Sequence, residues 1–157
     1  MAQKLAGRAV VWGPQQKADI IHLNCGLYDI VRHHDAQKNR VPLTQYSENV
    51  ELILTLFLHG APAELFWATA TPIDEERQHR VQSFYRFQDD IQAYNAEAGS
   101  IAGRLGVKIN DLYLLMTESG PQKHLAEDGV HFTEDGYRLL GDAVADAALR
   151  ILDVIDP

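Results

Sequence analysis

Apolar residues along the chain fall into two kinds of segment: short continuous runs and longer stretches with helical spacing. The run at 64–70 is continuous in apolar residues, and the run at 19–24 contains Ile20, Ile21 and Leu23; each predicts a strand. Shorter runs at 8–12 and 107–113 predict two further strands. Continuous apolar strands are typical of a parallel sheet that helices cover on both faces.

Three stretches carry apolar residues at three- and four-residue steps and therefore predict helices. The first spans 44–59 and stops at Gly60. The second spans 84–105, which makes it the longest predicted helix. The third follows Thr133, whose side chain can cap its first turn.

Three polar or charged segments, 33–42, 73–82 and 114–127, predict loops. Strands alternate with helices, and the connections are too long for hairpins. The pattern therefore predicts a mostly parallel sheet between two layers of helices, an α/β/α arrangement. No repeat or linker divides the chain, so we expect a single domain over residues 1–157.

Composition and charge narrow the functional classes. A net charge of -8, with Lys and Arg dispersed, disfavours nucleic acid and anionic membranes as partners. The single cysteine, Cys25, excludes an internal disulfide framework. The chain shows no signal-peptide pattern and no apolar run of about 20 residues, so we expect a cytoplasmic protein. Adjacent His33 and His34 lack the spacing of a zinc pair, so neither a metal nor another cofactor is expected.

The candidate chemistry lies just before the last predicted helix. Asp128 and His131 are three positions apart on a loop that contains Gly129. There Asp128 can accept a hydrogen bond from one ring nitrogen of His131, which leaves the other nitrogen free as a general base. The alternative is that Asp128 closes a turn and His131 is a packed loop residue.

Two motifs resemble conserved blocks of the SGNH, or GDSL-type, hydrolases. Residues 128–137 read Asp-Gly-Val-His-Phe-Thr-x-x-Gly-Tyr and resemble the last block, which carries that family's Asp–His pair. Residues 24–29 resemble the third block, Gly-x-Asn-Asp, with Gly26 and Asp29 matching. The resemblance runs from about residue 19 to the end. It implies a flavodoxin-like α/β/α fold and hydrolysis of small carboxylic esters, of the short-acyl or acetyl type.

The same resemblance implies roles for individual residues. His131 and Asp128 would be catalytic. Tyr28 stands where the family's oxyanion-hole Asn would be, so the amide of Asn24 or the hydroxyl of Tyr28 would replace that donor. The residues implied for oxyanion or substrate binding are Asn24, Gly26, Tyr28 and Asp29. The alternative for this segment is a plain turn at the end of a strand.

The sequence lacks the family's nucleophile motif, Gly-Asp-Ser. Its four serines, Ser47, Ser83, Ser100 and Ser119, stand in other contexts, so the chain resembles a member shortened by its first β–α unit. Cys25, at the predicted strand end, could attack as a thiolate if His131 lies within reach. The alternative for Cys25 is a small apolar residue that fills space.

Two functions follow from these observations. One is an ester hydrolase in which His131 acts as the general base. The other is a catalytically impaired remnant that serves as a ligand-binding or assembly module. A shortened sheet leaves a strand edge unprotected, so we expect a homo-oligomer, such as a dimer, that forms by pairing of this edge with a second copy.

Overall fold

The computed structural model describes residues 18–60 and 63–155, and within them a parallel sheet forms the centre of the fold. Its strands are β1 (Ile20–Leu23), β3 (Glu64–Ala68) and β5 (Lys108–Asn110), in the order β1-β3-β5. Both pairings are parallel. The structure thus confirms the predicted parallel sheet, whereas the strand predicted at 8–12 lies outside the described residues.

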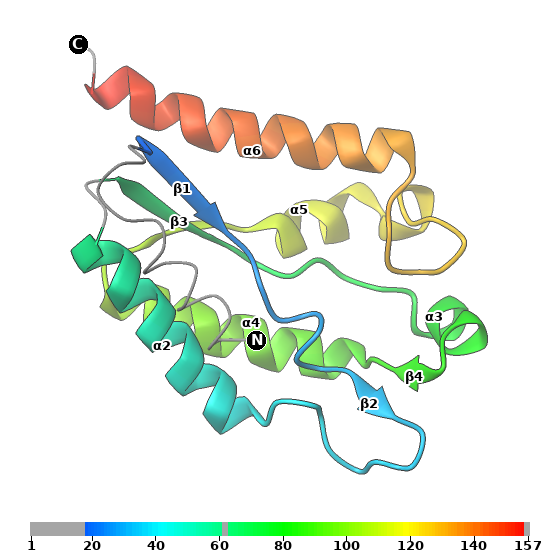
Figure 1. Cartoon of the computed structure of the whole chain (residues 1–157). Coiled ribbons are helices and arrows are strands. Elements are labelled where there is room, and N and C mark those ends of the chain that lie inside the picture. Colours follow the sequence, from blue (N-terminus) through cyan, green and yellow to red (C-terminus); the bar gives the residue numbers. More distant parts are fainter. Residues whose placement is uncertain (1–17, 61–62, 156–157) are drawn as a thin grey trace.

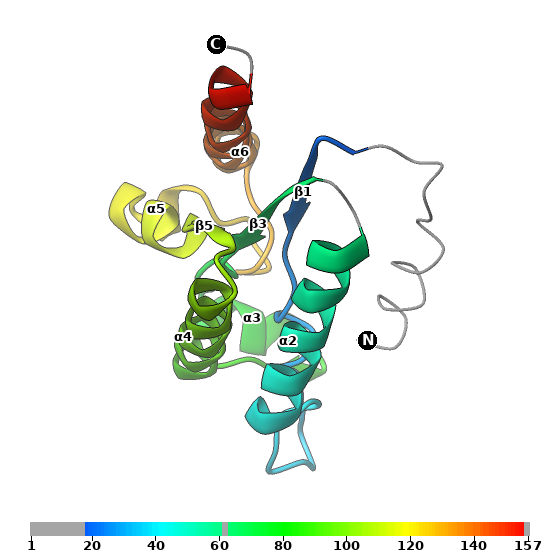
Figure 2. The ribbon, with the colours of Figure 1, turned by 90° about the vertical axis from the view of Figure 1, so that its left-hand side faces the viewer.

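Helices cover the sheet in two layers (Figures 1 and 2). Helices α2 (Leu43–Gly60) and α4 (Gln88–Arg104) lie side by side on one face. Helix α6 (Glu134–Ile155) crosses the other face, and α5 (Leu112–Ser119) lies next to it at the β5 edge. The predicted three-layer α/β/α architecture is therefore confirmed.

The two faces of the sheet are covered to different extents. The α2 and α4 side holds the main core, in which the following residues are at most 1% exposed: Val50, Leu54, Trp67, Ala98 and Ile101. On the other side, only Gly136 among residues 134–150 of α6 is buried. A groove of about 560 Å³ separates α6 from the sheet and is lined in part by Phe66, Asn110 and Ala147.

The segment 73–82, predicted as a loop, contains the helix α3 (Glu75–Val81). Its start is fixed by Asp74, whose carboxylate accepts a hydrogen bond from the backbone N–H of Arg77 at 3.0 Å. Glu75 and Glu76 in the first turn favour the helix by their interaction with its dipole. The prediction of a loop was wrong because it rested on the many charged residues of this segment and did not consider Asp74 as a helix cap.

The helix predicted from residue 84 begins only at Gln88. Residues Phe84–Tyr85 form the short strand β4, which pairs antiparallel with β2 (Arg32–His33). The start of the predicted loop 33–42 is therefore part of a small second sheet. The aromatic spacing suggested one continuous helix, but that run of aromatic residues crosses from a strand into a helix. The longest helix is α6, with 22 residues, and not α4, with 17.

The predicted strand 107–113 and loop 114–127 also need correction. The strand is limited to β5, and α5 begins directly after Asp111, whose carboxylate accepts a hydrogen bond from the N–H of Leu114. A short 3-10 turn, η1 (Pro121–Lys123), follows this helix. Helix α5 has only eight residues and buries only Leu112 and Met116, so its apolar residues span too few turns to predict a helix. The predicted cap of α6 is confirmed, since Thr133 Oγ1 accepts from the N–H of Gly136 at 3.3 Å.

Candidate active site at the carboxyl edge of the sheet

Side chains that follow the strands connect them at the carboxyl edge of the sheet. Asn24, directly after β1, donates from Nδ2 to the carbonyl of Ala68 at the end of β3, at 2.8 Å. Thr69 Oγ1 donates to Asp111 Oδ1 after β5, at 2.9 Å. These bonds fix the three strand ends relative to one another, and ligands of open α/β sheets bind at this edge.

The turn at residues 24–29 follows β1 and has a tightly specified backbone. Gly26 has a φ of 134°, which favours glycine, and its carbonyl accepts hydrogen bonds from the N–H groups of Asp29 and Ile30. The Tyr46 hydroxyl donates to the carbonyl of Cys25 at 3.3 Å and so ties the turn to α2. The backbone of this turn is thus defined by two local hydrogen bonds and by one contact that is distant in sequence.

The predicted binding residues of this turn have different environments. Tyr28 is half exposed, and the guanidinium of Arg40 lies 4.3 Å from the centre of its ring. Asp29 is buried, and burial raises the pKa of its carboxyl group. Asn24 has one amide N–H bonded to Ala68, which leaves the second available. The roles of these residues in oxyanion or substrate binding stay predictions.

The acid and the imidazole of the last motif are hydrogen-bonded. Asp128 Oδ1 accepts from the backbone N–H groups of Val130, at 3.0 Å, and His131, at 2.9 Å. Asp128 Oδ2 lies 2.5 Å from His131 Nδ1. Partial burial acts to raise the pKa of Asp128, but the hydrogen bonds from the His131 ring and from the two N–H groups hold it below its ordinary value.

This geometry sets the tautomer of His131. An ionised carboxylate only accepts hydrogen bonds, so Nδ1 carries the proton and Nε2 keeps its lone pair. The His131 side chain is 71% exposed, and in the described part of the chain no hydrogen bond occupies Nε2. His131 is therefore a solvent-accessible base with an oriented ring, as the sequence predicted for its geometry, and its catalytic role stays a prediction.

The loop that carries His131 is closed on itself and packs on α3. The N–H of Ala126 donates to the carbonyl of His131 at 2.8 Å, and the N–H of Thr133 donates to that of His124 at 2.7 Å. At Gly129, where φ is 70°, the N–H of Asp74 donates to the carbonyl at 2.8 Å. A Cβ added to Gly129 would lie 2.6 Å from the Asp74 carbonyl oxygen, so only glycine allows this approach.

Sequence reasoning missed Arg86, which bonds the turn from the segment before α4. Its side chain is buried, and Nε donates to the carbonyl of Leu27 at 2.6 Å. Burial lowers the pKa of Arg86, while Asp128 and Tyr28 act in the opposite direction. A lone arginine within the aromatic run Phe84–Phe87 was the available signal.

None of the candidate nucleophiles in the described residues hydrogen-bonds the His131 ring. Burial, followed by the nearby Asp29 carboxylate, raises the pKa of the Cys25 thiol to about 12, so Cys25 is protonated and a weak nucleophile at neutral pH. Ser47 Oγ donates to Glu97, and Ser119 Oγ donates to the carbonyl of Met116. All four serines lie in the described part of the chain, and there none hydrogen-bonds the His131 ring.

Two further observations concern the described residues alone. They contain no cluster of three or more His, Cys, Asp or Glu side chains with the arrangement of a metal site. Helices long and apolar enough to cross a membrane are likewise not found in this part of the chain.

Several solved structures share this fold. A lipase/acylhydrolase from Enterococcus faecalis superposes with a TM-score of 0.66 at 24% identity, over 82% of this chain and 60% of the enzyme. A lipolytic G-D-S-L family protein from Veillonella parvula gives a TM-score of 0.67 at 19% identity, over 93% of this chain and 71% of that protein. A variant acetyl-xylooligosaccharide esterase from Geobacillus gives a TM-score of 0.71 at 19% identity, over 92% of this chain and 65% of that enzyme. The chain thus spans less than two thirds of the first and third proteins.

Sequence comparison identifies the family. None of the functionally curated proteins matches the chain significantly. The model of the family described as GDSL-like lipase/acylhydrolase matches residues 3–144, and this match begins earlier in the chain than the motifs noted above. It includes both the turn after β1 and the Asp128–His131 loop. The chain therefore belongs to the GDSL-like lipase/acylhydrolase family.

Proposed function

We propose that the protein hydrolyses small carboxylic esters, with His131 as the general base and Asp128 as the group that orients it. The observation that carries this proposal is the hydrogen bond between His131 Nδ1 and Asp128 Oδ2, in a loop that the family match includes. It leaves Nε2 directed away from the carboxylate and accessible to a reactant.

In the proposed reaction, His131 Nε2 takes a proton from a water molecule as the water oxygen bonds to the ester carbonyl carbon. The imidazolium that forms is stabilised by the Asp128 carboxylate. When the carbon–oxygen bond to the alcohol breaks, Nε2 returns the proton to the leaving oxygen. The products are the carboxylic acid and the alcohol. Water is the proposed nucleophile because no described serine or thiol hydrogen-bonds the ring.

The negative charge that develops on the carbonyl oxygen needs hydrogen-bond donors. We assign this role to the turn at residues 24–29, where Asn24 has one amide N–H not used by Ala68. Tyr28 is half exposed on the same turn and would contact the substrate. The exposure of His131 suits a short acyl group, such as acetyl, on a larger alcohol, and esterases of acetylated sugars are among the proteins with this fold.

The direct test is hydrolysis of p-nitrophenyl acetate by the wild type and the His131→Ala variant. We expect the variant to lose about 10²- to 10⁴-fold in kcat/KM, the usual contribution of a general base. His59→Ala is the matched control, because His59 is an exposed histidine on α2 that bonds the carbonyl of Thr55. Equal rates for wild type and His131→Ala would remove the proposal.

A second candidate is a ligand-binding or assembly module that no longer turns over ester. It is favoured by the placement of the described serines, none of which hydrogen-bonds His131. In this case a fluorophosphonate probe would leave the protein unlabelled and the wild type would show no esterase activity. Covalent labelling of any serine would contradict this candidate.

We also propose that two copies associate through the edge of β1. Among the described strands, β1 pairs only with β3, so its other edge has no partner strand there. Light scattering coupled to size-exclusion chromatography would give at least twice the chain mass of 17.6 kDa. A monomeric mass across the micromolar range would contradict this association.

A further inference from the structure

The loop that carries His131 lies directly on the first turn of α3. Three atoms of α3 and its cap surround the Cβ position of Gly129. They are the carbonyl oxygen of Asp74 at 2.6 Å, Cβ of Arg77 at 2.9 Å and the backbone nitrogen of Gln78 at 3.1 Å. The loop and the helix therefore touch through their backbones, with no side chain of the loop between them.

Two peptide groups of the loop each bond α3 on one side and the acid–base pair on the other. The first peptide joins Gly129 to Val130. Its carbonyl accepts from the backbone N–H of Asp74 at 2.8 Å, and its N–H donates to Asp128 Oδ1 at 3.0 Å. The Asp128 carboxylate is thus connected to the cap of α3 through one planar unit.

The second peptide joins Leu125 to Ala126. Its carbonyl accepts from Nη1 of Arg77 at 3.4 Å, and its N–H donates to the carbonyl of His131 at 2.8 Å. Leu125 is 4% exposed and forms an isolated antiparallel bridge with Phe132, the residue after the histidine. His131 is thus also connected to α3 through one peptide, and here a side chain of the helix makes the contact.

The position of the Arg77 guanidinium is fixed by Asp74. Asp74 Oδ2 lies 3.3 Å from Arg77 Nε, and Oδ1 accepts from the backbone N–H of Arg77 at 3.0 Å. The two side chains are 31% and 15% exposed, so water screens this ion pair only in part. A charged donor forms a stronger hydrogen bond than a neutral one, which offsets in part the 3.4 Å distance to Leu125.

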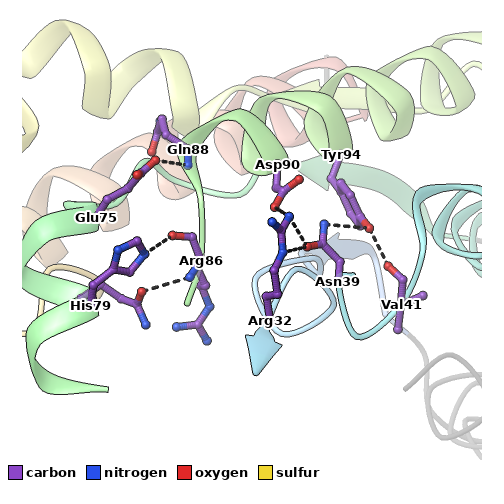
Figure 3. Close-up of polar contacts among 10 residues, drawn as sticks. Arg32, Asn39, Val41, Glu75, His79, Arg86, Gln88, Asp90 and Tyr94 are labelled. Atoms are coloured by element: carbon purple, nitrogen blue, oxygen red, sulfur yellow. Dashed lines mark hydrogen bonds and ion pairs between the residues drawn. The ribbon is translucent and has the colours of Figure 1, made fainter. Parts of the chain in front are cut away.

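The same helix also holds the segment before α4 (Figure 3). Gln78, which is fully buried, accepts from the N–H of Arg86 at 3.0 Å, and His79 Nε2 donates to the carbonyl of Arg86 at 2.8 Å. Arg86 Nε in turn donates to the carbonyl of Leu27, in the turn after β1, at 2.6 Å. Helix α3 is therefore bonded to the loop directly and to the turn through Arg86.

We propose that Arg77 is a positioning residue for the general base: it fixes the peptide that holds the His131 carbonyl and so sets where the ring stands relative to the turn at 24–29. For its catalytic consequence, this inference rests on the proposed function. Loss of the guanidinium frees the Leu125 carbonyl, whereas the bond between Asp128 and His131 is local and stays. The pair then keeps its own geometry but moves relative to the ester, which lowers kcat more than it raises KM.

Amide hydrogen exchange measures the hold on the loop directly. Arg77→Met removes both side-chain bonds, whereas Arg77→Lys keeps a charged donor. We expect the N–H of Ala126 to exchange about 10-fold faster in Arg77→Met than in wild type, and within about 3-fold of wild type in Arg77→Lys. The N–H of Leu54, in the core, should not change. Arg80→Met, at an exposed position of α3, is the control and leaves both N–H groups at the wild-type rate.

Hydrolysis of p-nitrophenyl acetate gives the second measurement. We expect Arg77→Met to lower kcat about 10-fold and to leave KM within about 2-fold of wild type, because the base is misplaced while the bound ester keeps its contacts. Arg77→Lys should recover at least about a third of the wild-type kcat. A residue that only stabilises the fold would not produce this separation of kcat from KM.

Unchanged exchange at Ala126 in Arg77→Met would overturn the inference, as would an equal acceleration in Arg80→Met. Faster exchange with a wild-type kcat, in a protein whose His131→Ala variant is inactive, would overturn it as well. If Arg77→Met does not fold, Arg77→Ala removes the same bonds and favours the helix. If His131→Ala hydrolyses the ester as fast as wild type while exchange is faster in Arg77→Met, the proposed function fails and the link from Arg77 to the loop stands.

Discussion

The two segments assigned to the proposed site are held in different ways. The loop at 124–133 is fixed by bonds between near neighbours, such as Asp128 to His131 and Ala126 to His131. The turn at 24–29 is fixed by Tyr46, Ala68 and Arg86, which are all distant in sequence. The Asp128–His131 pair thus owes its geometry to near neighbours, and the loop adds contacts with α3 at Gly129 and Leu125, whereas the turn adds three bonds from distant segments to its local bonds at Gly26.

This difference explains what each segment tolerates. A bond between close neighbours costs little chain entropy to close, so it can form early and survive changes elsewhere. A bond between distant segments exists only when the strands and helices are in place. Changes to the Asp128–His131 pair should therefore affect chemistry most, and changes to contacts between distant segments, at Gly129 or around the turn, should affect stability.

The largest effect is expected for Asp128→Asn. An amide at this position disfavours the tautomer that leaves Nε2 free, and the equivalent change in a serine-protease triad costs about 10⁴ in kcat. We expect kcat/KM for p-nitrophenyl acetate to fall by about 10³-fold or more. Asp135→Asn, on the exposed first turn of α6, is the matched control. Activity above a tenth of wild type in Asp128→Asn would show that the loop does not orient the base.

The next effect is expected for Gly129→Ala, which tests how the loop contacts α3. The new Cβ would meet the Asp74 carbonyl oxygen, and the positive φ adds backbone strain, so we expect a loss of about 2 to 3 kcal/mol in the free energy of unfolding. Gly141→Ala is the control, because no atom lies near its Cβ position within helix α6. Urea unfolding measures both, and equal stabilities would contradict the close approach.

A smaller effect is expected for Tyr46→Phe, which removes one long-range bond to the turn. Loss of the hydroxyl that donates to the Cys25 carbonyl should lower the free energy of unfolding by about 1 kcal/mol. Tyr137→Phe, at a half-exposed position, should change it by less than about 0.5 kcal/mol. A Tyr46→Phe variant as stable as wild type would mean that the turn does not depend on this contact.

The smallest effect concerns pH. Because the pKa of Asp128 is lower in the folded protein than in the unfolded chain, its bonds stabilise the fold above about pH 4 and are lost as the pH falls below that value. Asp128→Asn should therefore show a weaker drop in stability between pH 5 and 2 than wild type, as measured by urea unfolding at each pH. Parallel pH profiles for the two proteins would contradict a lowered pKa.

The parts that sequence predicted well are those with local signals. The motif around His131 predicted the hydrogen bond to Asp128 because both partners lie on one short loop. The strands β1 and β3 were predictable because each carries a short apolar run, although only β3 is buried and the residues of β1 are partly exposed. The cap at Thr133 likewise needs only its neighbours.

The parts that sequence did not predict depend on contacts between distant segments. The single fully buried side chain of helix α3, Gln78, lies in a charged stretch. The helix therefore shows no apolar periodicity that could predict it. Arg86 gains its position from Gln78, His79 and Leu27, which no spacing rule connects. The environment of Cys25, whose burial raises the pKa of its thiol, likewise follows from packing around the turn.

The closure of the His131 loop on itself has a consequence for how this protein can change over evolutionary time. Paired backbone bonds join residues 124–126 to 131–133, and Gly136 lets the first turn of α6 approach the His124 carbonyl. The acid and the base therefore lie in a segment of about ten residues whose two ends are joined by backbone hydrogen bonds. Substitutions outside that segment, other than at its contacts with α3, can therefore accumulate while the proton-accepting pair keeps its shape.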